Sequence, residues 1–121
     1  MMAELIPRLR DAALALLEAQ LEAGYNAAMA ERAGQEPPAL PAPSIDPALH
    51  ARVLHLLDVE RRIREGRCGR LWADELFGLD ALRAARARFE AAHPQCPHCA
   101  APLMKAADTR CWRCWRELKE N

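Results

Sequence analysis

Two closely spaced cysteine pairs near the carboxyl end constrain this 121-residue chain more than any other feature. Cys96 and Cys99 form one CxxC motif, Cys111 and Cys114 form a second, and eleven residues separate the two motifs. Two such pairs can supply four thiolates to one tetrahedral ion and leave no coordination position open. The spacing therefore predicts one structural Zn²⁺ ion with these four cysteines as its ligands.

The segment from residue 96 onward contains too few large apolar side chains to fold by burial alone. Those present are Leu103, Met104, Trp112, Trp115 and Leu118. A structural zinc ion supplies an apparent stabilisation of about 10 to 16 kcal/mol in such peptides near neutral pH, so we expect metal binding and folding to be one event. Two disulfides are the alternative use of the four thiols, which a reducing compartment disfavours.

Residues 96–118 resemble a zinc ribbon, whose pattern is a CxxC knuckle, a short hairpin, a second CxxC knuckle and a closing strand. Leu103 and Leu118 follow the two knuckles at the corresponding places. The resemblance implies a metal-held β-hairpin, but ribbons serve transcription, translation, replication and protein docking alike. The sequence departs from the pattern at Ala100 and Trp115, where glycine is common, and this predicts a slight distortion of both turns.

The remainder of the chain shows helical periodicity. Residues 3–34 predict one amphipathic helix with Gly34 as its stop, and the apolar stripe includes Leu5, Leu9, Ala12, Ala13, Leu16, Leu17, Leu21, Ala28 and Met29. Five prolines lie between residues 35 and 47, which predicts an extended connector. A second helix is expected from Pro47 to about Gly66, with Ser44 or Asp46 as its N-cap.

Beyond Gly69, residues 71–77 predict a short third helix that stops at Gly78, and Asp80 then caps a fourth helix over 81–93. The predicted fold is mainly α, a helical hairpin or small helical bundle followed by a four-cysteine zinc ribbon with a short β-hairpin. Residues 1–93 would form the helical domain, with the connector 35–47 inside it, and residues 94–121 the zinc-ribbon module. The sequence shows no internal repeat.

Charge and hydropathy exclude several classes of protein. The 17 basic residues balance 17 acidic ones, so no net charge draws the molecule to nucleic acid or to a membrane surface. The charge is nevertheless uneven, because residues 83–121 hold eight Arg or Lys against four Asp or Glu. No apolar run is long enough to span a membrane and no targeting segment is visible, so we expect a cytoplasmic protein.

A cluster of aromatic and basic residues surrounds the last cysteine. It contains Trp112, Arg113, Trp115 and Arg116, which predict a surface for nucleic acid or for a partner protein. The alternative is that one tryptophan shields the zinc sulfurs and the other packs on the helices. A second candidate surface consists of Arg83, Arg86 and Arg88, if residues 69–90 form a helix-turn-helix; otherwise these arginines are simply solvated.

Three other residues offer weaker candidate sites. His98 lies inside the first CxxC motif and would have to replace a cysteine to bind the metal. Cys68 is unpaired, and we interpret it as a small apolar filler rather than a nucleophile. Glu90 and His93 form a single ExxH motif, whereas di-metal bundles need two such motifs.

No catalytic interpretation fits this inventory, because a four-thiolate site leaves zinc no water to activate and no glycine-rich phosphate loop is present. We therefore expect neither an enzyme nor a small-molecule substrate. One hypothesis is an accessory factor that contacts DNA or RNA in a transcription, replication or mobile-element complex. The other is a protein adaptor, subunit or inhibitor of a larger assembly that docks through the long N-terminal helix. The aromatic and basic cluster favours the first hypothesis and the zero net charge favours the second.

Overall fold

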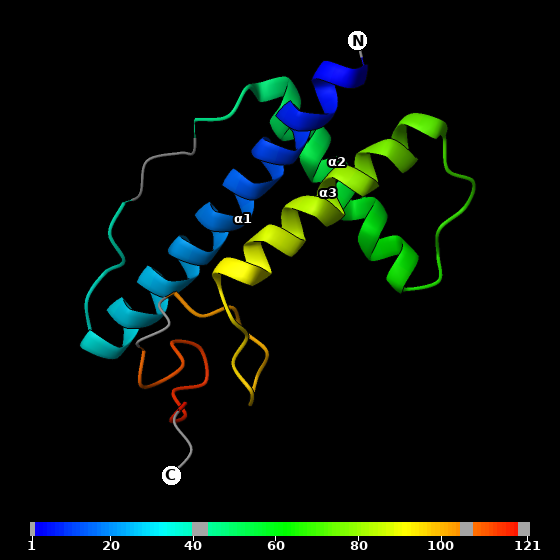
Figure 1. The fold of residues 1–121 in the computed structure, drawn as a ribbon. Helices are drawn as coiled ribbons and strands as arrows, with labels where there is room; N and C mark the ends of the chain where they lie inside the picture. The colour runs from blue at the N-terminus through cyan, green and yellow to red at the C-terminus, as the bar shows by residue number, and fades with distance from the viewer. Residues whose placement is uncertain (1, 40–43, 105–107, 119–121) are drawn as a thin grey trace. The chain divides into compact units, whose positions relative to one another are not determined.

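The computed structural model describes residues 2–39, 44–104 and 108–118, and it is mainly helical as predicted (Figure 1). Helix α1 spans Met2–Ala33, α2 spans Pro47–Arg64 and α3 spans Ala73–Ala92.

Contacts within the chain define two compact units. The helical unit comprises Met1–Leu17 and Pro43–Arg88, and the cysteine unit comprises Glu18–Ala42 and Phe89–Asn121. The predicted domain boundary at residues 93 and 94 stays a prediction, since packing contacts do not show which segments fold independently.

Local sequence signals place the helix ends. The side chain of Asp46 accepts hydrogen bonds from the amides of Ala48 and Leu49 at 2.8 and 3.3 Å, which satisfies two free N–H groups at the start of α2. Gly34 and Gly66 follow α1 and α2 with φ values of 66° and 69°, a left-handed conformation that glycine adopts without a Cβ clash. The predicted N-cap Asp46 and the predicted stops Gly34 and Gly66 are confirmed.

The predicted connector between α1 and α2 is free of helix where the structure describes it, at residues 35–39 and 44–46. Residues 40–43, which include Pro41 and Pro43, lie outside the described residues.

The helical unit has one apolar core, to which the first half of α1 contributes together with α2 and α3. Its buried members are Leu9, Ala12, Ala13, Leu16, Val53, Leu56, Val59, Leu79, Ala81, Leu82 and Ala85. The part of the predicted α1 stripe that belongs to this unit is therefore covered by the chain itself. None of the helices in the described part of the chain combines the length and apolar character needed to cross a bilayer.

The prediction of two separate helices over 71–77 and 81–93 is wrong, because α3 passes through Gly78 without a break. A Cβ atom added at Gly78 would lie 2.8 Å from a methyl carbon of Leu56. The glycine therefore permits a close approach of α3 to α2, and it does not end a helix.

Helix α3 begins at Ala73, directly after Trp72, whose amide donates to the carboxylate of Glu75 at 3.1 Å, and not after the predicted cap Asp80. Asp80 lies inside the helix. The helix-turn-helix considered for residues 69–90 does not form, since the required turn would fall within α3.

Candidate metal centre and the adjoining surface

The first cysteine pair lies in a short turn, which we call the first knuckle, residues 94–103. The amide of Ala100 donates to the carbonyl of Cys96 at 2.9 Å and closes the turn. The amide of Cys96 in turn donates to the carbonyl of Ala101 at 2.8 Å. This pair of bonds holds both cysteines of the motif on one tight loop.

The second knuckle, residues 109–118, repeats the same backbone fifteen residues later. The amide of Trp115 donates to the carbonyl of Cys111 at 2.8 Å, and the amide of Cys111 donates to the carbonyl of Arg116 at 3.1 Å. Each knuckle also contains one isolated antiparallel bridge. The two turns therefore share one backbone arrangement.

Both knuckles contain a residue with left-handed backbone at the same place. Ala100 and Trp115 each have a φ of 63°, although neither is glycine. This conformation costs a residue with a side chain roughly 1 to 2 kcal/mol. The closing hydrogen bonds have ordinary lengths, so the distortion predicted for the two turns is not observed.

The two knuckles bring the four predicted ligand sulfurs together. All four Sγ atoms lie within 4.8 Å of one another, with 3.7 Å between Cys96 and Cys114 and 3.6 Å between Cys99 and Cys111. A Zn–S bond of about 2.3 Å gives a tetrahedral S–S edge of roughly 3.8 Å. A disulfide would need about 2.05 Å. All five cysteines are free thiols, so the disulfide alternative is wrong and the four cysteines could hold a metal ion.

Backbone amides point at the sulfurs in both turns. The amide of His98 donates to the Sγ of Cys96 at 3.4 Å, and the amide of Arg113 donates to the Sγ of Cys111 at 3.3 Å. Such bonds favour the charged thiolate that a metal requires. The equivalent bond in each knuckle follows from the shared backbone.

The thiols of Cys99 and Cys111 differ in their pKa values. Burial disfavours the thiolate of Cys99, yet the amide of Ala101 and the neighbouring thiols together lower the pKa of Cys99 to about 6. Burial raises the pKa of the Cys111 thiol to about 11. Without a metal, Cys111 therefore keeps its proton near neutral pH, and an incoming cation must displace it.

The structure supports a metal-binding module in general rather than the zinc ribbon that the resemblance implies. In its described residues the segment contains two isolated bridges and no strand, and residues 105–107 lie outside the described residues. The β-hairpin and the zinc-ribbon type are therefore not confirmed. No protein-family model, curated protein or solved structure matches the chain. The cysteine geometry alone supports a metal-binding module.

Trp112 belongs to the internal packing of the cysteine unit. Its indole N–H donates to the carbonyl of Pro102 at 2.7 Å, which links the second knuckle to the first. Its ring lies against Gly24 of α1, where an added Cβ would come within 3.2 Å of the ring edge. The ring therefore occupies a fixed position.

Trp115 is the exposed member of the predicted cluster, with 42% of its surface accessible. The guanidinium carbon of Arg32 lies 4.4 Å from its ring centre and that of Arg110 lies 5.8 Å away. Arg113 donates to the carbonyl of Cys99, whereas Arg116 is exposed. Trp112 and Arg113 therefore make hydrogen bonds within the cysteine unit, whereas the side chains of Trp115 and Arg116 are exposed.

Arg32 is a functional candidate that the sequence analysis missed. From the last turn of α1 its guanidinium donates to the carbonyls of Trp112 and Arg113, at 2.5 and 3.4 Å. Tyr25 and Met29 precede Arg32 at helical spacing on the same helix, so they share its face. The spacing of these three residues was the signal for this face in the sequence, but the many alanines of the helix made the face hard to recognise.

The second predicted surface does not form a free basic face. Arg83 lies 3.7 Å from Asp80, and Arg86 pairs with Glu60 at 2.6 Å in a half-buried position. Arg88 is exposed. All three belong to the helical unit.

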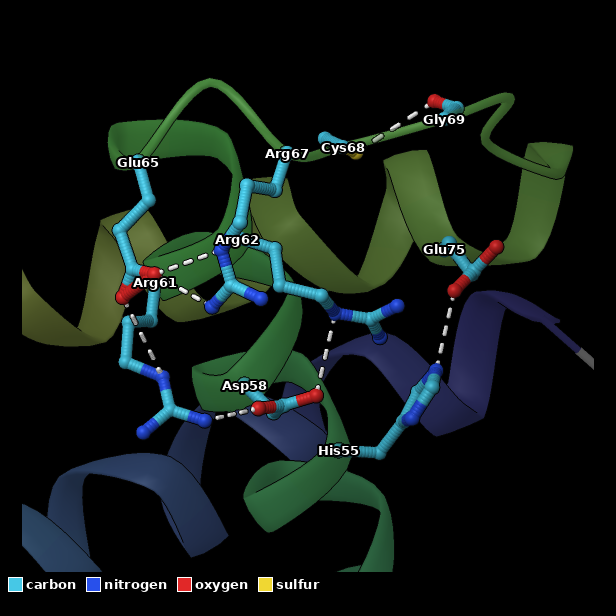
Figure 2. Close-up of polar contacts among 9 residues, drawn as sticks. All are labelled: His55, Asp58, Arg61, Arg62, Glu65, Arg67, Cys68, Gly69 and Glu75. Atoms are coloured by element: carbon cyan, nitrogen blue, oxygen red, sulfur yellow. Dashed lines mark hydrogen bonds and ion pairs between the residues drawn. The ribbon is translucent and has the colours of Figure 1, made fainter.

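Two arginines at the end of α2 and one just after it are also paired, as Figure 2 shows. Asp58 binds Arg61 at 2.6 Å and Arg62 at 3.1 Å, and Glu65 binds Arg67. The hydrogen bond from Arg61 lowers the pKa of the Asp58 carboxyl. Arg61, Arg62 and Arg67 therefore each have an acidic partner within the chain.

The weaker candidates are not among the clustered ligands of the described residues. His98 is exposed, with its Nε2 3.2 Å from the carbonyl of Glu117. Cys68 is half-buried in the helical unit, and its thiol donates to the carbonyl of Gly69 at 3.4 Å (Figure 2).

His93 has a structural position in the cysteine unit. Its Nδ1 lies 2.9 Å from the carbonyl of Leu103 and its Nε2 lies 2.7 Å from the carboxylate of Glu18. Both partners are acceptors, so a ring that carries both protons donates to each. His93 therefore joins α1 to the first knuckle, and it does not complete a metal site with Glu90.

Proposed function

We propose that the protein is a non-enzymatic, nucleic-acid-associated factor whose C-terminal module holds one structural Zn²⁺ ion and presents the second knuckle to DNA or RNA. The observation that carries the proposal is the cluster of four sulfurs within 4.8 Å. Tetrahedral sulfur sites select zinc or iron, and a closed four-thiolate site is typical of structural zinc. Its role would be that of an accessory factor in a transcription, replication or mobile-element complex.

The side chain of Trp115 is available for a role beyond packing. Its φ of 63° is shared by Ala100 at the matching place of the first knuckle, so the turn imposes that backbone and the exposed indole is what distinguishes the second knuckle. An exposed tryptophan offers a ring on which a base can stack.

Three arginines lie near that ring. Arg32 and Arg110 lie beside Trp115, where Arg110 is also ion-paired with Glu117 at 3.1 Å, and Arg116 follows Trp115 with an exposed side chain. Guanidinium groups bind phosphate oxygens in a bidentate way, so the surface offers both stacking and charge.

The first test is metal content. We expect native mass spectrometry of protein refolded with zinc to find one Zn²⁺ ion per chain, and Cys111→Ser to abolish it. Binding of iron in its place, or of no metal, would contradict the proposal.

The second test is a fluorescence anisotropy titration with labelled single- and double-stranded DNA and RNA at two salt concentrations. We expect binding that weakens steeply as salt rises and that falls in Trp115→Ala. Trp72→Ala is the matched control, since Trp72 is 66% exposed in the helical unit with Arg70 5.7 Å from its ring. Absence of binding at low salt would overturn the proposal in favour of a protein adaptor.

A further inference from the structure

We infer that a pocket beside the second knuckle binds one unpaired nucleobase, so that the protein prefers single-stranded nucleic acid. The inference rests on the proposed function and specifies which form of nucleic acid the protein binds. The pocket has a volume of about 360 Å³ and belongs entirely to the cysteine unit. Its lining residues are Tyr25, Met29, Asp108, Thr109, Arg110, Trp112 and Trp115.

The pocket walls are suited to a flat, aromatic group. Three of the chain's four tyrosine and tryptophan side chains, Tyr25, Trp112 and Trp115, line it together with the polarizable Met29. Bases stack on aromatic faces and gain about 1 to 3 kcal/mol each. The N–H of Trp112 is already donated to Pro102, so this ring offers the ligand only its π-surface.

The pocket is preorganised. Gly24 leaves just enough room for the Trp112 ring, and Arg32 lies over Trp115 while it bonds to the backbone of the second knuckle. Aromatic walls that are held before binding lose little conformational entropy when a ligand enters.

The charges of the lining do not select a charged ligand over a base. One acidic and one basic residue, Asp108 and Arg110, line the pocket, and both have partners within the chain, Arg110 in an ion pair with Glu117 at 3.1 Å. The lining therefore favours neither a phosphate nor a cation such as a methylated lysine over a neutral base, whose phosphates stay outside near Arg32 and Arg116. A larger cavity of about 770 Å³ lies in the helical unit, but Trp72 is the one tryptophan or tyrosine among its described lining residues.

The test compares single-stranded DNA of about ten nucleotides with its duplex. We expect the wild type to bind the single strand more tightly and its tryptophan fluorescence to be quenched. Tyr25→Ala should weaken single-strand binding by about 5- to 100-fold and leave duplex binding unchanged. Tyr25→Phe keeps the ring and is the matched control, while Arg116→Ala should weaken both forms similarly.

A second measurement uses the wild-type protein, so it does not depend on whether a variant folds. Photo-crosslinking with a single strand that carries 5-iodouracil should label Tyr25, Trp112 or Trp115, and mass spectrometry locates the adduct.

Each outcome is decisive. Crosslinks confined to other residues, equal binding of single strand and duplex, or capture of a trimethyl-lysine peptide in place of the single strand would overturn the pocket and leave the nucleic-acid role standing. Failure of every nucleic acid to bind would instead overturn the proposed function itself.

Discussion

The two knuckles share a backbone and differ in almost every side chain. The first contains Pro97, His98 and Ala100, whereas the second contains Trp112, Arg113 and Trp115 at the matching places. Their closing hydrogen bonds and their left-handed residues nevertheless coincide.

This difference shows what the metal site demands and what it leaves open. The cysteines, the two backbone bonds and one positive φ are common to both turns. The remaining positions are not used for coordination, and only the second knuckle fills them with aromatic and basic side chains. The comparison therefore separates residues that hold the ion from residues available for recognition.

The largest expected effect tests whether both knuckles depend on one ion. Cys96→Ser and Cys111→Ser each remove one thiolate, and either should lower Zn²⁺ affinity by several orders of magnitude because a structural zinc supplies about 10 kcal/mol or more. Chelator competition measures the affinity, and hydrogen exchange should then show loss of protection in both knuckles alike. Persisting protection in the unmutated knuckle would mean that the turns do not share an ion.

The second effect concerns the unequal thiols of the two knuckles. In the metal-free protein Cys111 has a pKa of about 11 and Cys99 one of about 6, so zinc binding near pH 7 releases at least the Cys111 proton. Affinity should rise about tenfold per pH unit for each proton released, and more steeply below about pH 6, where Cys99 is also protonated. Calorimetry in buffers of different ionisation enthalpy counts the protons, and a pH-independent affinity would contradict the prediction.

A smaller effect should distinguish the supports of the two knuckles. Arg32→Ala removes the bonds to the carbonyls of Trp112 and Arg113 and should destabilise the second knuckle by about 1 to 3 kcal/mol. His93→Ala is the mirror control, since His93 bonds to Leu103 in the first knuckle. Residue-resolved hydrogen exchange should show each loss in its own knuckle, and identical patterns would refute separate supports.

The smallest effect concerns the two left-handed residues. Ala100→Gly removes strain and a side chain with no large contact, so it should stabilise the metal-loaded protein by about 1 kcal/mol. Trp115→Gly relieves the same strain but loses the ring beside Arg32, so its net gain should be smaller or negative. Thermal unfolding of the zinc-loaded variants measures both, and equal stabilisation would show that the Trp115 ring contributes nothing to the fold.

The sequence was sufficient for the features that depend on local chemistry. The cap at Asp46, the stops at Gly34 and Gly66 and the four clustered cysteines all follow from residue type and spacing. The helical assignment of most of the chain depends on the same periodic signals.

Features that depend on a distant partner could not be predicted in this way. Gly78 looks like a helix stop, and only the nearby Leu56 side chain shows that it is a close-packing position. Likewise, the pairing of Arg86 with Glu60 is a three-dimensional fact, since 26 residues separate the two in sequence.

The indole of Trp112 links the two knuckles by a hydrogen bond that does not pass through the ion. Its bond to the carbonyl of Pro102 joins one pair of sulfur donors to the other. As metal binding folds the module, this bond raises the effective concentration of the second pair around an ion already held by the first, so we expect chelate closure to be fast.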